Sequence, residues 1–133
     1  MKKIAVLGGG QVGSSLAKIL TDDGNDITLI DNDLSTLNDI QEDNDIKTIQ
    51  IDNGNYIVDS GSPHFITFKD NIENLDVESE GRSIRNIDKF SKDGINVNFV
   101  SLGNSIRIRT YERGVESETL SCGTGAVAAS IPI

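Results

Sequence analysis

The single cysteine of the chain, Cys122, directly precedes Gly123-Thr124-Gly125 and a short alanine-rich run that ends at Ser130. This composition predicts a helix that begins near Cys122. Amides at a helix N-terminus and the helix dipole favour negative charge, so a thiolate and a neighbouring anionic ligand group would both be stabilised there. A thiolate in this position can act as a base or nucleophile. The alternative is that Cys122 is a small, buried apolar residue.

A second set of residues suited to ligand binding lies near the start of the chain. Gly8, Gly10 and Gly13 match the pattern G-x-G-x-x-G, and Asp31 follows at about the offset of a ribose-binding acid. Such glycines let the backbone approach a pyrophosphate at a helix N-terminus, while the acid accepts hydrogen bonds from ribose hydroxyls. The pattern therefore indicates a dinucleotide site. The alternative is a tight glycine turn that binds no ligand.

The overall composition limits the classes of partner. The 133 residues carry a net charge of −9, which disfavours nucleic acid or an anionic membrane surface as the main partner. One cysteine cannot form an internal disulfide, so we expect a cytoplasmic protein. The apolar run after Lys3 stops at Gly8, too short for an export signal or a membrane span. We expect small-molecule ligands and no metal.

The first third of the chain predicts alternating strands and helices. Residues 3–7 form a continuous apolar run that suits a strand buried on both faces. Val12, Leu16, Ile19 and Leu20 then recur at helical spacing up to a polar stop at 21–24. A strand at 26–31, a helix marked by Leu34, Leu37 and Ile40, and a third strand at 46–49 follow. The order β-α-β-α-β predicts parallel strands joined by right-handed crossovers.

The remaining two thirds predict strands around a helix. Strands are expected at 56–58, 65–68, 96–102 and 105–110, the last two joined through Gly103-Asn104 as a two-residue hairpin. Asp76 is expected to cap a helix that runs to Arg85, which Gly81 would weaken.

Five polar side chains of this region are candidates for binding or for solvent exposure. His64 lies in a glycine-proline turn, where a functional group is plausible but a surface residue is the commoner case. Ile106 and Ile108 are expected to face the core, with Arg107 and Arg109 directed to solvent. Glu112 and Arg113 come a short loop before Cys122 and suit the ammonium and carboxylate of an amino acid.

Residues 1–48 resemble the nucleotide-binding segment of Trk-type potassium-uptake regulators. The resemblance rests on residues 4–13, on Leu16-Ala17 and on Asn25-Asp-Ile-Thr-Leu-Ile-Asp31. It implies that Gly8, Gly10, Gly13 and Asp31 hold the adenosine and phosphate part of NAD or a related adenine nucleotide.

Residues 51–130 resemble the C-terminal half of diaminopimelate epimerase, a cofactor-independent amino acid epimerase. The motifs are residues 61–64, 94–99, 109–114 and 118–125. The resemblance implies that Cys122 is one of two opposed cysteines that exchange the substrate α-proton, with His64 assisting. Substrate contacts would come from Asn96, Glu112 and Arg113, from the backbone amides of Gly123 and Thr124, and from Ser62, where many members have asparagine.

The chain departs from both families in what it lacks. It has no second cysteine, and Pro132 ends the helix after Cys122. The sequence is therefore interpreted as an α/β chimera of a truncated Rossmann-like fragment, 1–50, and a truncated epimerase half-domain, 51–133, whose mostly antiparallel sheet surrounds a helix. The expected function is an incomplete epimerase site. The alternatives are a nucleotide-binding regulatory module and a chimeric or designed protein without activity. Unpaired sheet edges would invite homo-oligomers.

Overall fold

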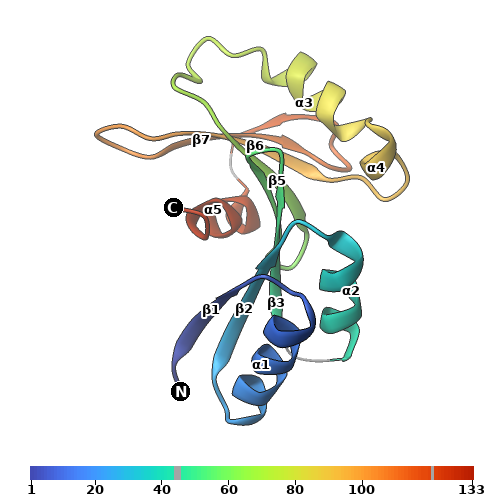
Figure 1. The fold of residues 1–133 in the computed structure, drawn as a ribbon. Helices are drawn as coiled ribbons and strands as arrows, with labels where there is room; N and C mark the ends of the chain where they lie inside the picture. The colour runs from blue at the N-terminus through green and yellow to red at the C-terminus, as the bar shows by residue number, and fades with distance from the viewer. Residues whose placement is uncertain (44–45, 121) are drawn as a thin grey trace. The chain divides into compact units, whose positions relative to one another are not determined.

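The computed structural model of the protein, shown as a ribbon in Figure 1, describes residues 1–43, 46–120 and 122–133. Packing divides the chain into two compact units, Met1–Asn53 and Gly54–Ile133. Both units combine strands with helices, so the α/β class predicted from the sequence is confirmed. Ser121, part of the motif around Cys122, lies outside the described residues.

The first unit is a β-α-β-α-β arrangement with parallel strands. Its elements are β1 (Lys3–Leu7), α1 (Gln11–Asp22), β2 (Asp26–Asp31), α2 (Leu34–Asp43) and β3 (Lys47–Asp52). Strand β1 pairs in parallel with β2, and β2 pairs in parallel with β3. The predicted Rossmann-like order is confirmed.

Only one face of this three-stranded sheet is covered within the unit. Helices α1 and α2 both lie on that face, because successive right-handed crossovers place their helices on the same side (Figure 1). Residues that face the helices, such as Val6, Ile27 and Leu29, are buried, whereas Leu7 on the opposite face is 80% exposed. The prediction that the first strand is buried on both faces is therefore wrong.

Helix α1 forms where predicted but packs through a different stripe. Its contact side consists of Gly13, Ala17 and Leu20. Val12, Leu16 and Ile19 are 81%, 46% and 58% exposed. The reason lies at Gly13, where an added Cβ would come 1.8 Å from the carbonyl oxygen of Gly8. This close approach selects the small-residue stripe and leaves the larger side chains outside.

The second unit is a five-stranded, mostly antiparallel sheet. Its elements are β4 (Asn55–Asp59), β5 (Pro63–Phe68), α3 (Val77–Arg85), α4 (Asp88–Ser91), β6 (Asn96–Ser101), β7 (Arg107–Glu112), β8 (Ser117–Thr119) and α5 (Gly123–Ser130). Neighbouring strands are antiparallel except for β5 and β6, which are parallel. The short elements α4 and β8 were not predicted, because three or four residues carry too little periodicity.

Helices cover both faces of this second sheet. Helices α3 and α4 lie on one side and α5 lies on the other (Figure 1). Every residue of β6 is buried as a result. The side facing α3 holds an apolar core that includes Phe65, Val97, Phe99 and Tyr111. The side facing α5 is polar, and the candidate site is built there.

Helix α3 confirms its predicted start and end. The Asp76 carboxylate accepts a hydrogen bond from the Ser79 amide at 3.0 Å, as an N-cap should. Gly81 has a packing role, because a Cβ there would lie 2.4 Å from the Tyr111 Cβ. The glycine that weakens the helix thus lets α3 approach β7 closely.

The hairpin between β6 and β7 differs from its prediction. Ser101 is opposite Arg107, so the connection has five residues, 102–106, and neither Gly103 nor Asn104 has the positive φ of a tight two-residue turn. Ile106 falls in this connection and is exposed, not in the core. Arg109 does not point freely into solvent either. Its guanidinium binds both carboxylate oxygens of Glu118 at 2.7 Å and the carbonyls of Ile72 and Leu75.

Candidate functional site

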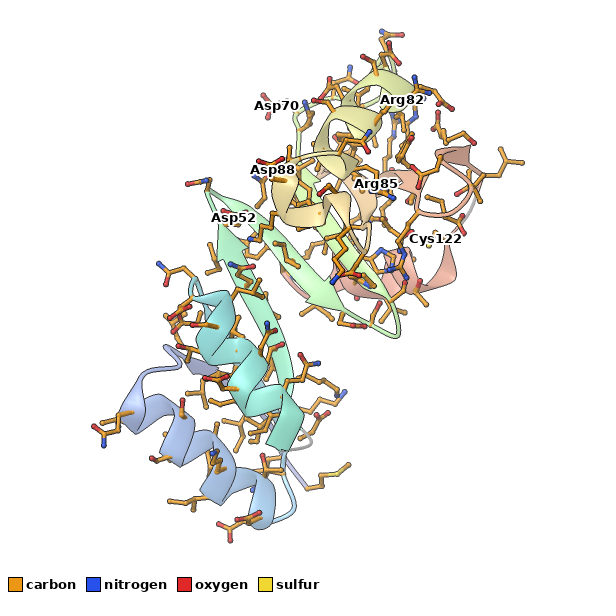
Figure 2. The ribbon with its side chains drawn as sticks, turned by 90° about the vertical axis from the view of Figure 1, so that its right-hand side faces the viewer. Asp52, Asp70, Arg82, Arg85, Asp88 and Cys122 are labelled. Atoms are coloured by element: carbon orange, nitrogen blue, oxygen red, sulfur yellow. The ribbon has the colours of Figure 1, made fainter. Side chains whose placement is uncertain are left out.

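Cys122 occupies the position expected for a thiol at a helix N-terminus. It is the N-cap residue of α5 and is half-buried; it is labelled in Figure 2. Its carbonyl oxygen accepts the first intrahelical hydrogen bond from the Ala126 amide at 3.0 Å. The amides of Gly123 and Thr124 precede that bond and have no acceptor within the helix. Both residues are exposed.

Small residues let α5 approach the polar face of the sheet. A Cβ on Gly125 would lie 2.6 Å from the Asn98 side-chain oxygen, so only glycine fits this contact. The Ser60 hydroxyl also donates to the Thr124 carbonyl at 2.8 Å. These contacts attach the first turn of α5 to strand β6 and to the loop between β4 and β5, and they determine where Cys122 lies.

His64 is the second residue of β5 and has no exposed surface, so the interpretation of a surface turn residue is wrong. The Asn98 amide nitrogen donates to His64 Nδ1 at 2.9 Å. The amide orientation follows from its other partners, since its nitrogen faces the Phe65 carbonyl and its oxygen accepts from the Thr110 hydroxyl. Nδ1 is therefore an acceptor, and the ring is neutral with its proton on Nε2. Burial lowers the pKa of His64 below 6.5 and favours this neutral form.

A chain of hydrogen bonds leads from His64 to the sulfur of Cys122. His64 Nε2 lies 3.0 Å from Thr124 Oγ1 and 3.1 Å from Ser62 Oγ. Because Nε2 is the donor, the Thr124 hydroxyl is free to direct its own proton toward Cys122 Sγ, 3.5 Å away. A hydroxyl donor aimed at sulfur stabilises negative charge on it. The buried imidazole thus acts on the thiol through one intervening hydroxyl.

Asn96 connects the rest of the predicted substrate-binding set. Its amide nitrogen donates to Ser62 Oγ and to the Pro63 carbonyl, each at 3.1 Å. Its oxygen accepts from the backbone amide of Arg113 at 2.9 Å. The Arg113 guanidinium is directed away and donates to the Asp93 carbonyl at 3.1 Å. Glu112 ends β7 and is half-buried.

A cavity of about 260 Å³ adjoins Cys122. It is lined by Ile108, Thr110, Thr119, Leu120, Cys122, Gly123 and Ala126. The Thr119 hydroxyl is buried there and has no hydrogen-bond partner among the described residues. Buried polar atoms are normally paired, so this hydroxyl is an exception among the described side chains. The cavity is slightly smaller than a typical site for a drug-sized ligand, so it would admit only a small molecule.

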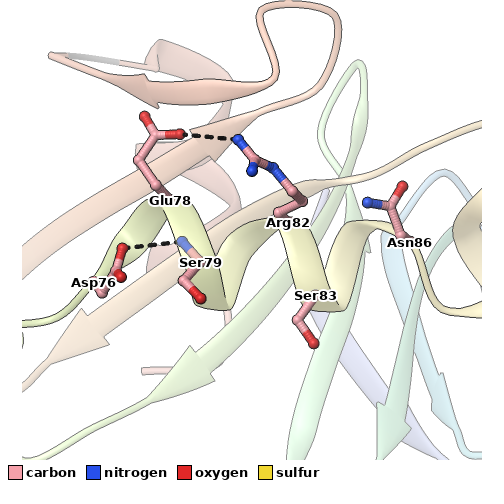
Figure 3. Close-up of a pocket in the computed structure, with 6 residues that line it drawn as sticks. All are labelled: Asp76, Glu78, Ser79, Arg82, Ser83 and Asn86. Atoms are coloured by element: carbon pink, nitrogen blue, oxygen red, sulfur yellow. Dashed lines mark hydrogen bonds and ion pairs between the residues drawn. The ribbon is translucent and has the colours of Figure 1, made fainter.

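A larger pocket lies along α3, away from these groups. Asp76, Glu78, Ser79, Arg82, Ser83 and Asn86 line it, as Figure 3 shows. Its charged groups already have partners, since Arg82 lies 3.8 Å from Glu78 and the Asp76 carboxylate caps the helix. This arrangement stabilises α3 and offers no nucleophile or proton-transfer chain.

In the first unit, two glycines of the motif and the aspartate that follows it have structural roles. Gly8 has a φ of 95°, which favours glycine, and Gly13 is required where α1 meets the Gly8 carbonyl. Asp31 accepts hydrogen bonds from the amides of Gly9 and Asp33, and these bonds lower its pKa. Its carboxylate therefore holds the glycine loop against the end of β2.

Gly10 is the exception in this motif. It is the N-cap of α1 with an ordinary φ of −62°, and an added Cβ would meet no atom within 4 Å. Neither backbone strain nor packing demands a glycine at this position. A ligand that approaches the helix N-terminus is one physical reason for it.

Sequence reasoning missed the residues that orient the predicted side chains or line the cavity beside Cys122. Asn98, Thr110 and Thr119 were not selected, although Asn98 orients His64 and Thr119 lines the cavity. The available signal was the alternation Asn96-Val97-Asn98, which puts two amides on one face of a strand. The burial of these two amides depends on α5, which packs over that face of the strand and is distant from it in the sequence.

The geometry defines a half-buried thiol at a helix N-terminus, linked to a buried neutral histidine on a mostly antiparallel sheet. Comparison with known families agrees with this class. The family model for diaminopimelate epimerase matches residues 56–132, and that for the TrkA-N domain matches residues 4–57. The chain belongs to the diaminopimelate epimerase family. The two resemblances seen in the sequence are both confirmed.

Curated relatives match this chain over part of their length. The diaminopimelate epimerase of Flavobacterium psychrophilum is 48% identical over 98 residues, covering 66% of this chain and 38% of the relative. That of Hydrogenobaculum sp. is 54% identical over 80 residues, covering 57% of this chain and 29% of the relative. That of Chlorobaculum tepidum is 50% identical over 78 residues, covering 57% of this chain and 30% of the relative. The chain spans less than two-fifths of the length of each of these three relatives.

Among the described residues, no helix is long and apolar enough to cross a membrane. The same part of the chain contains no group of three or more His, Cys, Asp or Glu side chains that could hold a metal ion.

Proposed function

We propose that the unit Gly54–Ile133 provides one face of a cofactor-independent amino acid epimerase site, with Cys122 as its proton-transfer group. The supporting observation is the chain from His64 Nε2 through the Thr124 hydroxyl to Cys122 Sγ, with steps of 3.0 and 3.5 Å. With the His64 proton on Nε2, the Thr124 hydroxyl accepts from the ring and can donate to the sulfur. A thiol at the end of such a series of hydrogen bonds is positioned to exchange a proton with a bound substrate.

The proposed step is removal of the α-proton of an amino acid such as diaminopimelate. The α C–H bond breaks, the proton forms an S–H bond with Cys122, and the electron pair remains on the α-carbon and its carboxylate. The free amides of Gly123 and Thr124 would bind that carboxylate. Ser62, Asn96, Glu112 and Arg113 would form the remaining substrate contacts, which for Arg113 requires its guanidinium to leave the Asp93 carbonyl.

The proposed reaction is exchange of the α-hydrogen without inversion. Inversion needs one group to remove the proton and another to return it on the opposite face. The chain has one cysteine, so Cys122 returns the proton to the face from which it came. We therefore expect the site to exchange the α-hydrogen without producing the other stereoisomer.

The test is deuterium uptake into diaminopimelate in heavy water, followed by mass spectrometry. We expect uptake with the unaltered chain, none above background with Cys122→Ala, and reduced uptake with Thr124→Val, which removes the connecting hydroxyl. Ser130→Ala at the far end of α5 is the matched control. Equal uptake by the unaltered chain and Cys122→Ala would refute the proposal.

A second candidate function is nucleotide binding by Met1–Asn53, favoured by the unfilled space at Gly10. The amides at the start of α1 would bind the phosphates of NAD or an adenine nucleotide, and the free lone pairs of Asp31 would accept from the ribose. This unit would hold the adenosine half of a dinucleotide.

Calorimetry with NAD, ATP and AMP tests this candidate through Gly10→Ala. The Cβ fits the free protein, so the cost in stability should be limited to the weaker N-cap, about 1 kcal/mol or less, while binding is lost. Gly103→Ala is a matched control, since its Cβ would meet a single atom, the Ser105 carbonyl oxygen, at an ordinary contact distance of 3.9 Å. Absence of heat with all three nucleotides, or equal heat from Gly10→Ala and the unaltered chain, would rule the candidate out.

A further inference from the structure

The first unit has an open sheet edge. Among the described residues, β1 pairs with β2 alone and stands at the end of the strand order. The Lys2 carbonyl accepts from the Asp26 amide, and the Gly8 amide donates to the Ile30 carbonyl. Even-numbered residues of this segment therefore direct their backbone groups toward β2. In a parallel pair, alternate residues direct both backbone groups to the same side. The amides and carbonyls of Lys3, Ala5 and Leu7 therefore point away from β2, at the open edge.

The exposed apolar stripe of α1 lies on the same side as this edge. At roughly 100° per residue, with Ala17 toward the sheet, Leu16, Val12 and Ile19 are rotated about 100–160° to one side. For a helix in a right-handed crossover, that side is the one above β1 and away from α2. Unpaired backbone groups and unburied aliphatic side chains are therefore adjacent.

A second copy of the chain fits both features at once. A two-fold axis perpendicular to the sheet and midway between the two Ala5 residues makes the two β1 strands antiparallel. Lys3 then pairs with Leu7 of the second copy, Ala5 pairs with its own counterpart, and every outward backbone group gains a partner. The same axis places the two α1 helices side by side and antiparallel on one face. Their stripes of Val12, Leu16 and Ile19 then meet.

The charges on α1 suit this antiparallel arrangement. The helix has no acidic residue in its first turn and no basic residue in its last. Asp22 and Asp23 instead stand at its C-terminal end, where they oppose the dipole of their own helix. In the antiparallel pair, they approach the positive N-terminus of the other α1.

We propose that the chain forms a two-fold homodimer through the β1 edge and the α1 stripe, giving a continuous six-stranded sheet from the two first units. This assigns a partner to the sheet edge and to the apolar stripe. It is independent of the epimerase proposal, which concerns the other unit.

Sedimentation of the full chain over a concentration series tests the proposal. The unaltered chain should shift from 14.3 kDa toward twice that mass as concentration rises. The double variant Leu16→Glu with Ile19→Glu should weaken association at least about tenfold, because it puts charges where aliphatic groups are buried. The control Ser15→Glu with Lys18→Gln makes the same change in net charge on the side of α1 away from the stripe and should associate normally.

A cross-linking experiment checks the register without depending on the helix variants. In the dimer, Ala5 faces its own counterpart with Cα atoms about 5.5 Å apart, within disulfide range. In a Cys122→Ser background, Ala5→Cys should form a disulfide-linked dimer on mild oxidation. Thr28→Cys, one strand further from the axis, should not. A monomer at every concentration, association unaffected by the Leu16 and Ile19 changes, or equal cross-linking at both positions would overturn the proposal.

Discussion

The hydrogen bond from Asn98 sets the tautomer of the only histidine in the chain, His64, while burial lowers its pKa. Replacing Asn98 by aspartate exchanges the amide donor for a carboxylate of nearly the same shape. The neutral ring would then lose the donor to Nδ1, whereas a ring protonated on both nitrogens would gain a charged acceptor. Asn98→Asp should therefore raise the pKa of His64 from its lowered position.

The size of this change follows from the distances. The amide nitrogen and Nδ1 are 2.9 Å apart, so the carboxylate and imidazolium charges would be separated by about 4 Å. At an effective dielectric constant of about 20, their attraction is about 4 kcal/mol, which equals about three pKa units. Desolvation of a carboxylate in this buried position opposes the gain. We expect a net rise of about one to three units.

The assay is a nuclear magnetic resonance titration of the single histidine Hε1 signal. The unaltered chain should titrate below 6.5, with ring nitrogen shifts that report a proton on Nε2. Asn98→Asp should titrate at a higher pH, and Asn53→Asp serves as an exposed control that adds the same charge in a turn. A pKa at or above 6.5 in the unaltered chain, or no rise in Asn98→Asp, would refute the account of the histidine.

Three further predictions follow from the packing and charges of the second unit. Gly81→Ala should destabilise the fold by about 1–3 kcal/mol in urea titrations, because its Cβ would lie 2.4 Å from the Tyr111 Cβ; unchanged stability would contradict this contact. Arg109→Lys should lower the free energy of unfolding by about 1–2 kcal/mol in the same assay, because lysine cannot bind both oxygens of Glu118 while reaching the carbonyls of Ile72 and Leu75. An unchanged free energy of unfolding would mean that solvent replaces these bonds. The free energy of unfolding should fall as pH drops below about 6.5, because His64 is protonated in the unfolded chain at a higher pH than in the folded one. The slope should be at most about 1.4 kcal/mol per pH unit. His64→Gln should abolish this dependence.

The order of elements was predictable because it depends on local patterns. The runs at 3–7 and 26–31 coincide with β1 and β2, and the Asp76 cap starts α3 as expected. Alternating or continuous apolar runs, capping residues and glycine stops act over a few positions and need no knowledge of distant contacts. The same locality explains the missed hairpin length at 102–106, because residue type alone did not determine the φ of Gly103 and Asn104.

The chemistry of the site was predictable as a set of residues but not as an arrangement. The sequence alone determined that a thiol precedes a helix and that a histidine and an asparagine lie upstream. The tertiary structure decided that His64 is buried, that Asn98 sets its tautomer, and that Thr124 connects it to Cys122. The physical reason is that these bonds join residues up to sixty positions apart, through strand register and the close approach of Gly125. Register and burial are properties of the packed sheet, which no single segment contains.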